Sequence, residues 1–157
     1  MSYAARVLQP GETIVYQARI HWIVYLGGIV LVMAAVALAV AAVVVQGDAV
    51  RIALMAAAAL ALVVGLFHLL RAWLRVAGTE ITVTSRRVIY KIGIVSRSTL
   101  EMNLDKVESV LVQQSLLGRM LDFGTVIVRG VGAGLEPVDR VANPLELHRN
   151  IGAPAAS

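Results

Sequence analysis

The sequence predicts two transmembrane helices in a hairpin, joined to a small antiparallel β domain that ends in one helix. Two long segments without charged residues, 22–45 and 52–70, predict the hairpin. Short runs of alternating β-branched residues after Thr79 predict the β domain, and an Asn-Pro pair near the C-terminus predicts the helix. The 157-residue chain is 59% hydrophobic, which is too apolar for an ordinary soluble domain.

The N-terminal segment, residues 1–21, contains a strand-like run. Within Pro10–Arg19, Ile14, Tyr16 and Ala18 occupy every second position, as expected of a strand with one buried face. This run either adds a strand to the sheet or forms an amphipathic segment beside the membrane. We favour the added strand.

The first apolar segment, 22–45, has 24 residues without a charge. As a helix it would be about 36 Å long, enough to cross a hydrocarbon core of about 30 Å. The second predicted span, 52–74, begins with 19 residues that include no Asp, Glu, Lys or Arg. A helix of a soluble core would carry polar residues on one face, and a signal peptide would have a shorter apolar run. We therefore predict two transmembrane helices.

The short loop at 46–51 requires the two predicted helices to be antiparallel. The outer flanks carry four arginines: Arg6, Arg19, Arg71 and Arg75. The charges of Asp48 and Arg51 in the loop cancel, so the positive-inside rule places both termini in the cytoplasm and the loop outside. These basic flanks also account for most of the net charge of +4, so we expect no nucleic-acid partner.

Small residues recur at every fourth position of the second span. They are Ala53, Ala57, Ala61 and Gly65. Such a ridge predicts close approach of a second helix. The first span, through Ala35 and Ala39, is the expected partner, and self-association is the alternative.

The predicted β domain occupies residues 76–151 and is followed by a tail, 152–157. Six strands are expected, at 80–84, 87–92, 94–103, 107–114, 125–129 and 135–141. Residues 130–134 are expected to form a loop. Asn143 is a good N-cap and Pro144 suits the first helical position, which predicts a helix over 145–151 that closes the sheet.

An apolar turn joins two of these strands. Ser115 can cap a helical turn, and Gly118 allows a tight path through it. The turn carries four large apolar side chains: Leu116, Leu117, Met120 and Leu121. They are too apolar for an exposed loop, so we predict that they are buried against either the sheet or the bilayer.

Several motifs resemble those of bacterial membrane-anchored PH-like proteins, the YdbS-like group of the bacterial PH domain family. The resemblance covers nearly the whole chain, and its most specific part is the sequence VESVLVQQSLLG at 107–118, followed by FGT at 123–125. Val107 and Met120 depart from the family pattern but remain apolar. Weaker matches are TSRRVIY at 84–90 and the Asn143–Pro144 pair.

The resemblance implies a cytoplasmic PH-like antiparallel β-barrel with a C-terminal helix, attached to the bacterial inner membrane by the helical hairpin. It also implies structural roles for the matched motif positions. These are Gln114, Ser115, Leu117, Gly118, Arg119, Gly124, Thr125 and Pro144.

No residue pattern indicates catalysis. The chain has no cysteine, and its three histidines, His21, His68 and His148, are far apart in the sequence. The glycines of 130–134 lack the Lys-Ser/Thr pair of a phosphate-binding loop. We therefore expect no enzymatic activity, no cofactor and no bound metal.

Four basic residues surround the first hairpin of the β domain: Arg86, Arg87, Lys91 and Arg97. In PH-like domains this hairpin often faces acidic headgroups, and each cation near an anionic bilayer contributes about 1 kcal/mol. The alternative, which we favour, is a solvated strand edge protected by its charges.

The sequence therefore predicts a membrane-anchored interaction or scaffold module at the cytoplasmic face of the inner membrane. Its expected partners are the lipid bilayer and either a protein partner or a second copy of the chain. A module that senses anionic lipid headgroups through the first hairpin is one alternative. An accessory subunit of a transport or envelope complex is the other.

Overall fold

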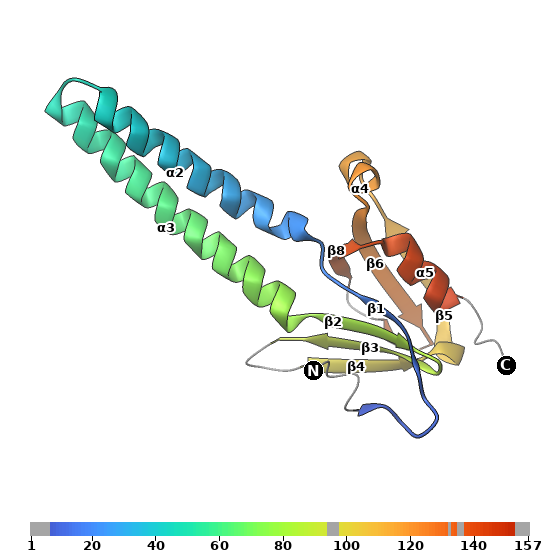
Figure 1. The fold of residues 1–157 in the computed structure, drawn as a ribbon. Coiled ribbons are helices and arrows are strands. Elements are labelled where there is room, and N and C mark those ends of the chain that lie inside the picture. The colour runs from blue at the N-terminus through green and yellow to red at the C-terminus, as the bar shows by residue number, and fades with distance from the viewer. Residues whose placement is uncertain (1–6, 94–97, 132, 135–136, 153–157) are drawn as a thin grey trace. The chain divides into compact units, whose positions relative to one another are not determined.

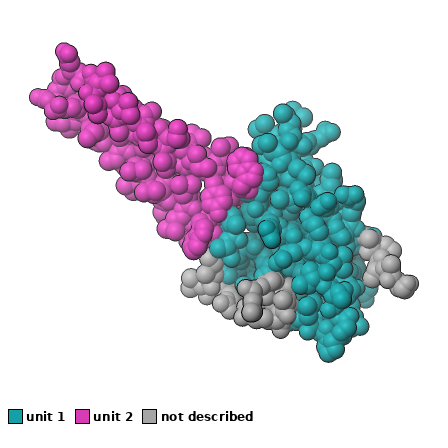
Figure 2. Space-filling model, in the orientation of Figure 1, with its two compact units in different colours: residues 1–21, 76–157 teal, residues 22–75 magenta. Residues whose placement is uncertain are grey.

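The structure is a computed structural model that describes residues 7–93, 98–131, 133–134 and 137–152 (Figure 1). The chain divides into two compact units, each described by itself (Figure 2). Residues 22–75 form the helical unit, and residues 1–21 together with 76–157 form the β unit.

The helical unit is an antiparallel helix pair. A 3-10 turn, η1 (Trp22–Tyr25), leads into α2 (Leu26–Val44), and α3 (Asp48–Gly78) follows, its last three residues belonging to the β unit. Both helices are long and apolar enough to cross a membrane. Helix α3 begins four residues earlier than predicted. Asp48 places a negative charge in its first turn, where the helix dipole favours it, and accepts a 2.8 Å hydrogen bond from Arg51.

Buried small residues recur every seven positions along both helices. They are Gly28, Ala35 and Ala42 on α2 and Ala58, Gly65 and Ala72 on α3. At Gly28 a Cβ atom would lie 2.7 Å from the Leu69 side chain, so a glycine is needed there. This seven-residue seam differs from the predicted four-residue ridge: Ala53 and Ala57 are exposed. A seven-residue repeat stays on one helix face better than a four-residue repeat does.

The β unit contains two four-stranded antiparallel sheets. The first has the strand order β1 (Ile14–Ala18), β2 (Glu80–Thr84), β3 (Arg87–Ile92) and β4 (Ser98–Asn103). In the second, β6 (Phe123–Gly130) pairs with β5 (Val107–Gln113), β7 (Ala133–Gly134) and β8 (Val138–Ala142). The N-terminal run is therefore a strand of the first sheet. The 3-10 turn η2 (Leu104–Lys106) joins the sheets, α4 (Leu116–Met120) joins β5 to β6, and α5 (Pro144–Gly152) follows β8.

The described residues form two sheets rather than the closed barrel that was predicted. The sheets meet at one corner, where Ile20 bridges Val141 and the Ala142 N–H donates to the Arg19 carbonyl at 2.9 Å. At the opposite corner η2 separates β4 from β5, and these two strands do not pair in the described part of the chain. The turn thus breaks the hydrogen-bond ladder that would close a barrel.

The core of the β unit lies between the two sheets and α5. Val83, Val88 and Val141 are fully buried on the strands. Leu147 and Ile151, four residues apart on α5, are also buried. Their spacing places both on one face of the helix, so α5 packs against the sheets through that face.

Candidate functional site

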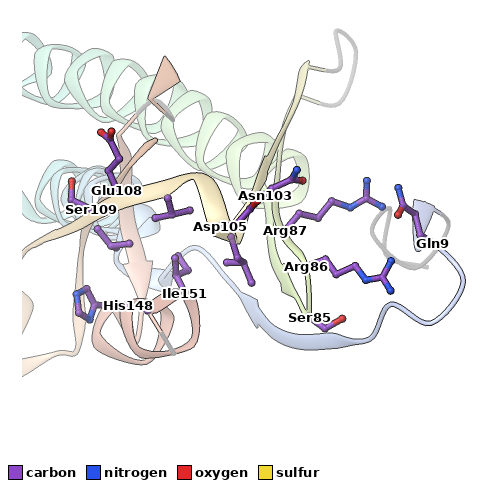
Figure 3. Close-up of a pocket in the computed structure, with 14 residues that line it drawn as sticks. Gln9, Ser85, Arg86, Arg87, Asn103, Asp105, Glu108, Ser109, His148 and Ile151 are labelled. Atoms are coloured by element: carbon purple, nitrogen blue, oxygen red, sulfur yellow. The ribbon is translucent and has the colours of Figure 1, made fainter. Parts of the chain in front are cut away.

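A groove of about 860 Å³ opens at the surface of the β unit (Figure 3). One wall is β5, which contributes residues 107–110, and another is α5, which contributes His148 and Ile151. The β2–β3 turn contributes Ser85 and Arg86, and η2 contributes Leu104 and Asp105. The remaining lining residues are Gln9, Arg87, Asn103 and Gly152. We call this site the β5–α5 groove.

Strand β5 lies at the edge of its sheet. It pairs with β6, and no other described strand pairs with it. An edge strand presents alternate backbone N–H and C=O groups away from its own sheet. Because α5 packs beside β5 through the buried Leu147 and Ile151, the groove places this strand edge next to a fixed helix.

The charges that line the groove are mixed. Arg86 is exposed, and so are the two acids Asp105 and Glu108. Ser109 and Asn103 add neutral polar groups. A site for an anionic ligand carries an excess of cations. The described lining has no such excess, because Arg86 and Arg87 are matched by Asp105 and Glu108.

Arg87, one of the predicted lipid contacts, is held by carboxylates within the β unit. Its Nε and Nη2 donate to the two carboxylate oxygens of Glu12 at 3.0 and 2.8 Å, and its Nη1 donates to Glu101 at 2.7 Å. Nη2 also donates to the Val7 carbonyl at 2.9 Å. The Arg87 side chain is only 12% exposed and that of Glu12 is fully buried. Arg87 therefore fastens the N-terminal segment to the start of β3.

The pKa of Glu12 reflects this network. Burial alone would raise it, but hydrogen bonds from Arg87, the Gln9 N–H and the Thr84 hydroxyl, together with the Arg87 charge, outweigh burial. The result is a pKa lowered from 4.5 to about 2. Glu12 is consequently ionised at neutral pH. No local sequence signal reveals this pair, because its members are 75 positions apart.

Arg86 and Lys91, two of the other predicted basic residues, lie at opposite ends of β3. Arg86 is exposed on the β2–β3 turn and lines the groove. Lys91 is half-buried at the far end of β3, about 13 Å along the strand from Arg87, and pairs in register with Glu80. Arg97 lies outside the described residues.

The family-motif residues form the frame of α4. Gln114 Nε2 donates to the carbonyls of Gly118 and Phe123 at 3.3 and 3.2 Å. Ser115 is the N-cap, and its hydroxyl accepts from the Gly118 N–H at 3.1 Å. A Cβ atom at Gly118 would lie 2.6 Å from the Phe123 carbonyl, so only glycine fits. These contacts fix α4 to the first residue of β6.

The remaining motif residues support the same corner. A Cβ atom at Gly124 would lie 2.7 Å from the Gln113 carbonyl and 3.3 Å from the Pro144 ring. The Thr125 hydroxyl donates to Asp139 at 2.8 Å, which joins β6 to β8. Arg119 is exposed in the last turn of α4.

The apolar side chains of α4 are not buried against the sheet, contrary to one of the two predicted placements. Leu116 and Met120 are each 80% exposed, and Leu117 is 64% exposed. Leu121, just after the helix, is 41% exposed. The Gln114 and Ser115 hydrogen bonds hold α4 as a separate turn that projects beyond the end of β6 (Figure 1).

Comparison with known proteins identifies the family of the chain. A family model described as "Bacterial PH domain" matches residues 15–154, which include both apolar helices and nearly all of the β unit. No curated protein and no solved structure matches the chain.

Proposed function

Because the chain belongs to the bacterial PH domain family, we propose that it is a membrane-anchored interaction module. In this proposal the helical unit anchors the chain in the bacterial inner membrane, with both termini in the cytoplasm. The β unit binds an extended segment of a protein partner in the β5–α5 groove. This function requires no catalytic step.

The exposed apolar surface of the helical unit supports the membrane anchor. Only 17% of the most apolar window of Trp22–Val44 is buried, and only 11% of that of Asp48–Gly78. Helices of a soluble core would be mostly buried, and soluble proteins rarely expose apolar patches of this extent to water. In a bilayer, lipid chains would cover this surface, so that it would not be exposed to water. The basic flanks favour a cytoplasmic location for both ends.

The single observation that carries the interaction role is the unpaired edge of β5 beside a groove. A partner segment in extended conformation can add to such an edge through backbone hydrogen bonds, with alternate side chains entering the groove. The mixed charges of Arg86, Asp105 and Glu108 suit a polypeptide with both signs of charge.

The lipid-sensing alternative at the first hairpin has less support, because Glu12 and Glu101 engage the guanidinium of Arg87. An accessory subunit of a transport or envelope complex would use the same groove to bind its complex. That alternative differs from the proposal only in the identity of the partner.

Site-specific photocrosslinking in native membranes tests the groove. A photoreactive residue at Ser109, in β5, should crosslink to a discrete partner through an extended segment. Thr99 is the matched control, because it is exposed on β4, an edge strand of the other sheet, and does not line the groove. Equal crosslinking at both positions, or none at Ser109, would contradict the proposed site.

Cysteine labelling tests the anchor, since the chain has no native cysteine. A membrane-impermeant maleimide applied to intact spheroplasts should label Gln46→Cys, in the loop between α2 and α3. It should label Ser109→Cys only after the membrane is permeabilised. Labelling of Ser109→Cys in intact spheroplasts would overturn the orientation.

A further inference from the structure

The tip of α4 is an apolar surface that the proposed function does not use. We define the α4 tip as Leu116, Leu117 and Met120, three large side chains that are all exposed. The hydrogen bonds of Gln114 and Ser115 hold this helix at its N-terminal end. Three exposed apolar side chains on a fixed helix indicate contact with another apolar surface or with lipid.

The α4 tip lies close to the residue through which the chain enters the apolar hairpin. The β unit ends at His21, and the apolar segment begins at the next residue, Trp22. The His21 ring contacts the Phe123 ring, with centroids 5.3 Å apart. Phe123 is three residues from Met120, at most about 10 Å of extended chain. The chain therefore leaves the β unit for the apolar segment from the same corner that carries α4.

Exposed arginines surround this corner of the β unit. Arg119 belongs to α4, and Arg140 lines a shallow cavity of about 560 Å³ together with Gln114 and Ser115. Arg19, which follows β1, lies beside the end of β8, because its carbonyl accepts a hydrogen bond from the Ala142 N–H. Asp122 is an exposed acid in the same turn. Arginines around an apolar tip complement anionic headgroups above an acyl phase.

The backbone around α4 is also held in an uncommon conformation. Three non-glycine residues with positive φ occur in the described part of the chain, namely Asp122 at 55°, Arg140 at 58° and Asn143 at 49°. The Arg140 carbonyl accepts from the His21 N–H at 2.6 Å, and the Asp122 carbonyl accepts from the Asn143 N–H at 3.0 Å. The strained residues thus connect α4, β8 and α5 to the end of the N-terminal segment, at the corner where the α4 tip projects.

We propose that the α4 tip inserts into the headgroup–acyl boundary of the bilayer that holds the hairpin. Leu116, Leu117 and Met120 enter the apolar side of that boundary, and Arg119 and Arg140 contact anionic headgroups. The inserted tip is a third membrane contact, in addition to the two helices, and it limits the orientations of the β unit at the membrane. This inference rests on the membrane anchoring proposed above.

Lipid quenching in proteoliposomes of the full chain tests the insertion. Single-cysteine variants carry an environment-sensitive fluorophore, and the vesicles contain phosphatidylethanolamine, phosphatidylglycerol and a spin-labelled lipid. Leu117→Cys reports on the α4 tip. Val131→Cys is the matched control, because Val131 is apolar, 69% exposed and at the opposite end of β6. Val40→Cys, an exposed position within α2, reports on the anchor.

We expect a blue-shifted spectrum and quenching by the spin-labelled lipid at Leu117→Cys and Val40→Cys, and neither at Val131→Cys. Quenching at Leu117→Cys should weaken in vesicles without phosphatidylglycerol. Met120→Cys is a second probe of the α4 tip and should show the same blue shift and the same quenching as Leu117→Cys.

The outcomes that overturn the inference differ from those that overturn the anchor. Quenching at Val40→Cys without quenching at Leu117→Cys and Met120→Cys refutes insertion of the α4 tip and leaves the anchor intact. A blue shift at Leu117→Cys without lipid quenching means that protein, such as a second copy, covers the tip, and this also refutes insertion. Absence of quenching at Val40→Cys refutes the membrane anchoring and the inference together.

Discussion

Replacing Arg87 with methionine removes the cation that contacts the buried Glu12 carboxylate. Methionine keeps much of the length and apolar volume of the arginine stem, so the change removes mainly the charge and its hydrogen bonds. Glu12 would keep only the Gln9 N–H and the Thr84 hydroxyl as described partners. A carboxylate that loses its cation while it remains buried destabilises the folded state.

The size of the effect follows from the pKa of Glu12. Its fall from 4.5 to about 2 corresponds to about 3.5 kcal/mol of stability at neutral pH, at about 1.4 kcal/mol for each pKa unit. Gln9 and Thr84 supply part of this stabilisation. Arg87 is partly exposed, and solvent screening lowers its share further, so we expect a loss of about 2 kcal/mol for Arg87→Met. With a urea dependence of about 1.5 kcal/mol per molar, the unfolding midpoint should fall by about 1 M or more.

Pulse proteolysis of the full chain in detergent micelles at several urea concentrations measures this midpoint for the β unit. Arg86→Met is the matched control, since Arg86 is the neighbouring residue but is exposed and has no ion pair among the described residues. Its midpoint should equal that of the wild type. Equal midpoints for Arg87→Met and Arg86→Met would refute the structural role of Arg87.

The same comparison has a defined pH dependence. The folded-state pKa of Glu12 is below its unfolded value, so the stability it contributes is present above about pH 4.5 and is lost as the pH falls toward about 2. The wild type loses this contribution in acid, whereas Arg87→Met has already lost most of it. The difference between the two midpoints should therefore shrink by about half or more at pH 3, measured with an acid protease. A difference that stays constant would mean that Glu12 is not the group responsible.

Three further changes can be checked with matched experiments. Thr82→Val should raise the urea midpoint of the β unit by an amount equivalent to about 1 kcal/mol, because the fully buried Thr82 hydroxyl has no hydrogen-bond partner among the described residues; a lower midpoint would contradict this. Leu147→Ala should cost about 2–5 kcal/mol by leaving a cavity under α5, whereas Leu145→Ala, at a position 54% exposed on the same helix, should leave the midpoint nearly unchanged. Gly118→Ala should increase hydrogen exchange of the amides in 114–124, because its Cβ would meet the Phe123 carbonyl; Gly27→Ala, where no atom lies within 4 Å, should leave their exchange as it is.

Local patterns in the sequence were sufficient to predict most of the elements. Apolar runs predict the two helices, and the Asn143–Pro144 pair predicts the start of α5 within one residue. The packing of these elements against one another was harder to predict from the sequence. The seam between α2 and α3 depends on which small residues face the other helix, and both the four-residue and the seven-residue spacings occur in an alanine-rich segment. Closure of the barrel depends on η2, a three-residue turn that no strong local signal marks.

The site was harder to predict because its determinants are distant in the sequence or depend on exposure. Arg87 appeared available to a ligand, since Glu12 is separated from it by the entire hairpin. The groove exists because no described strand pairs with β5 on one side, and the sequence of a strand does not show whether it is an edge. For Leu116 and Leu117 the sequence indicated an apolar environment, but hydrophobicity alone does not reveal whether protein or lipid provides it.

Strand β1 precedes the helical hairpin in the chain and β2 follows it, yet the two strands pair along the first sheet. The ion pair of Glu12 with Arg87 spans the same interval. In the proposed membrane orientation, synthesis and insertion must finish both helices before this sheet can form, and they must return the chain to the side from which it started. A chain that crossed the bilayer an odd number of times would leave β1 without its neighbour and Glu12 without its cation. Protease resistance of the β unit would therefore report whether the hairpin had inserted completely.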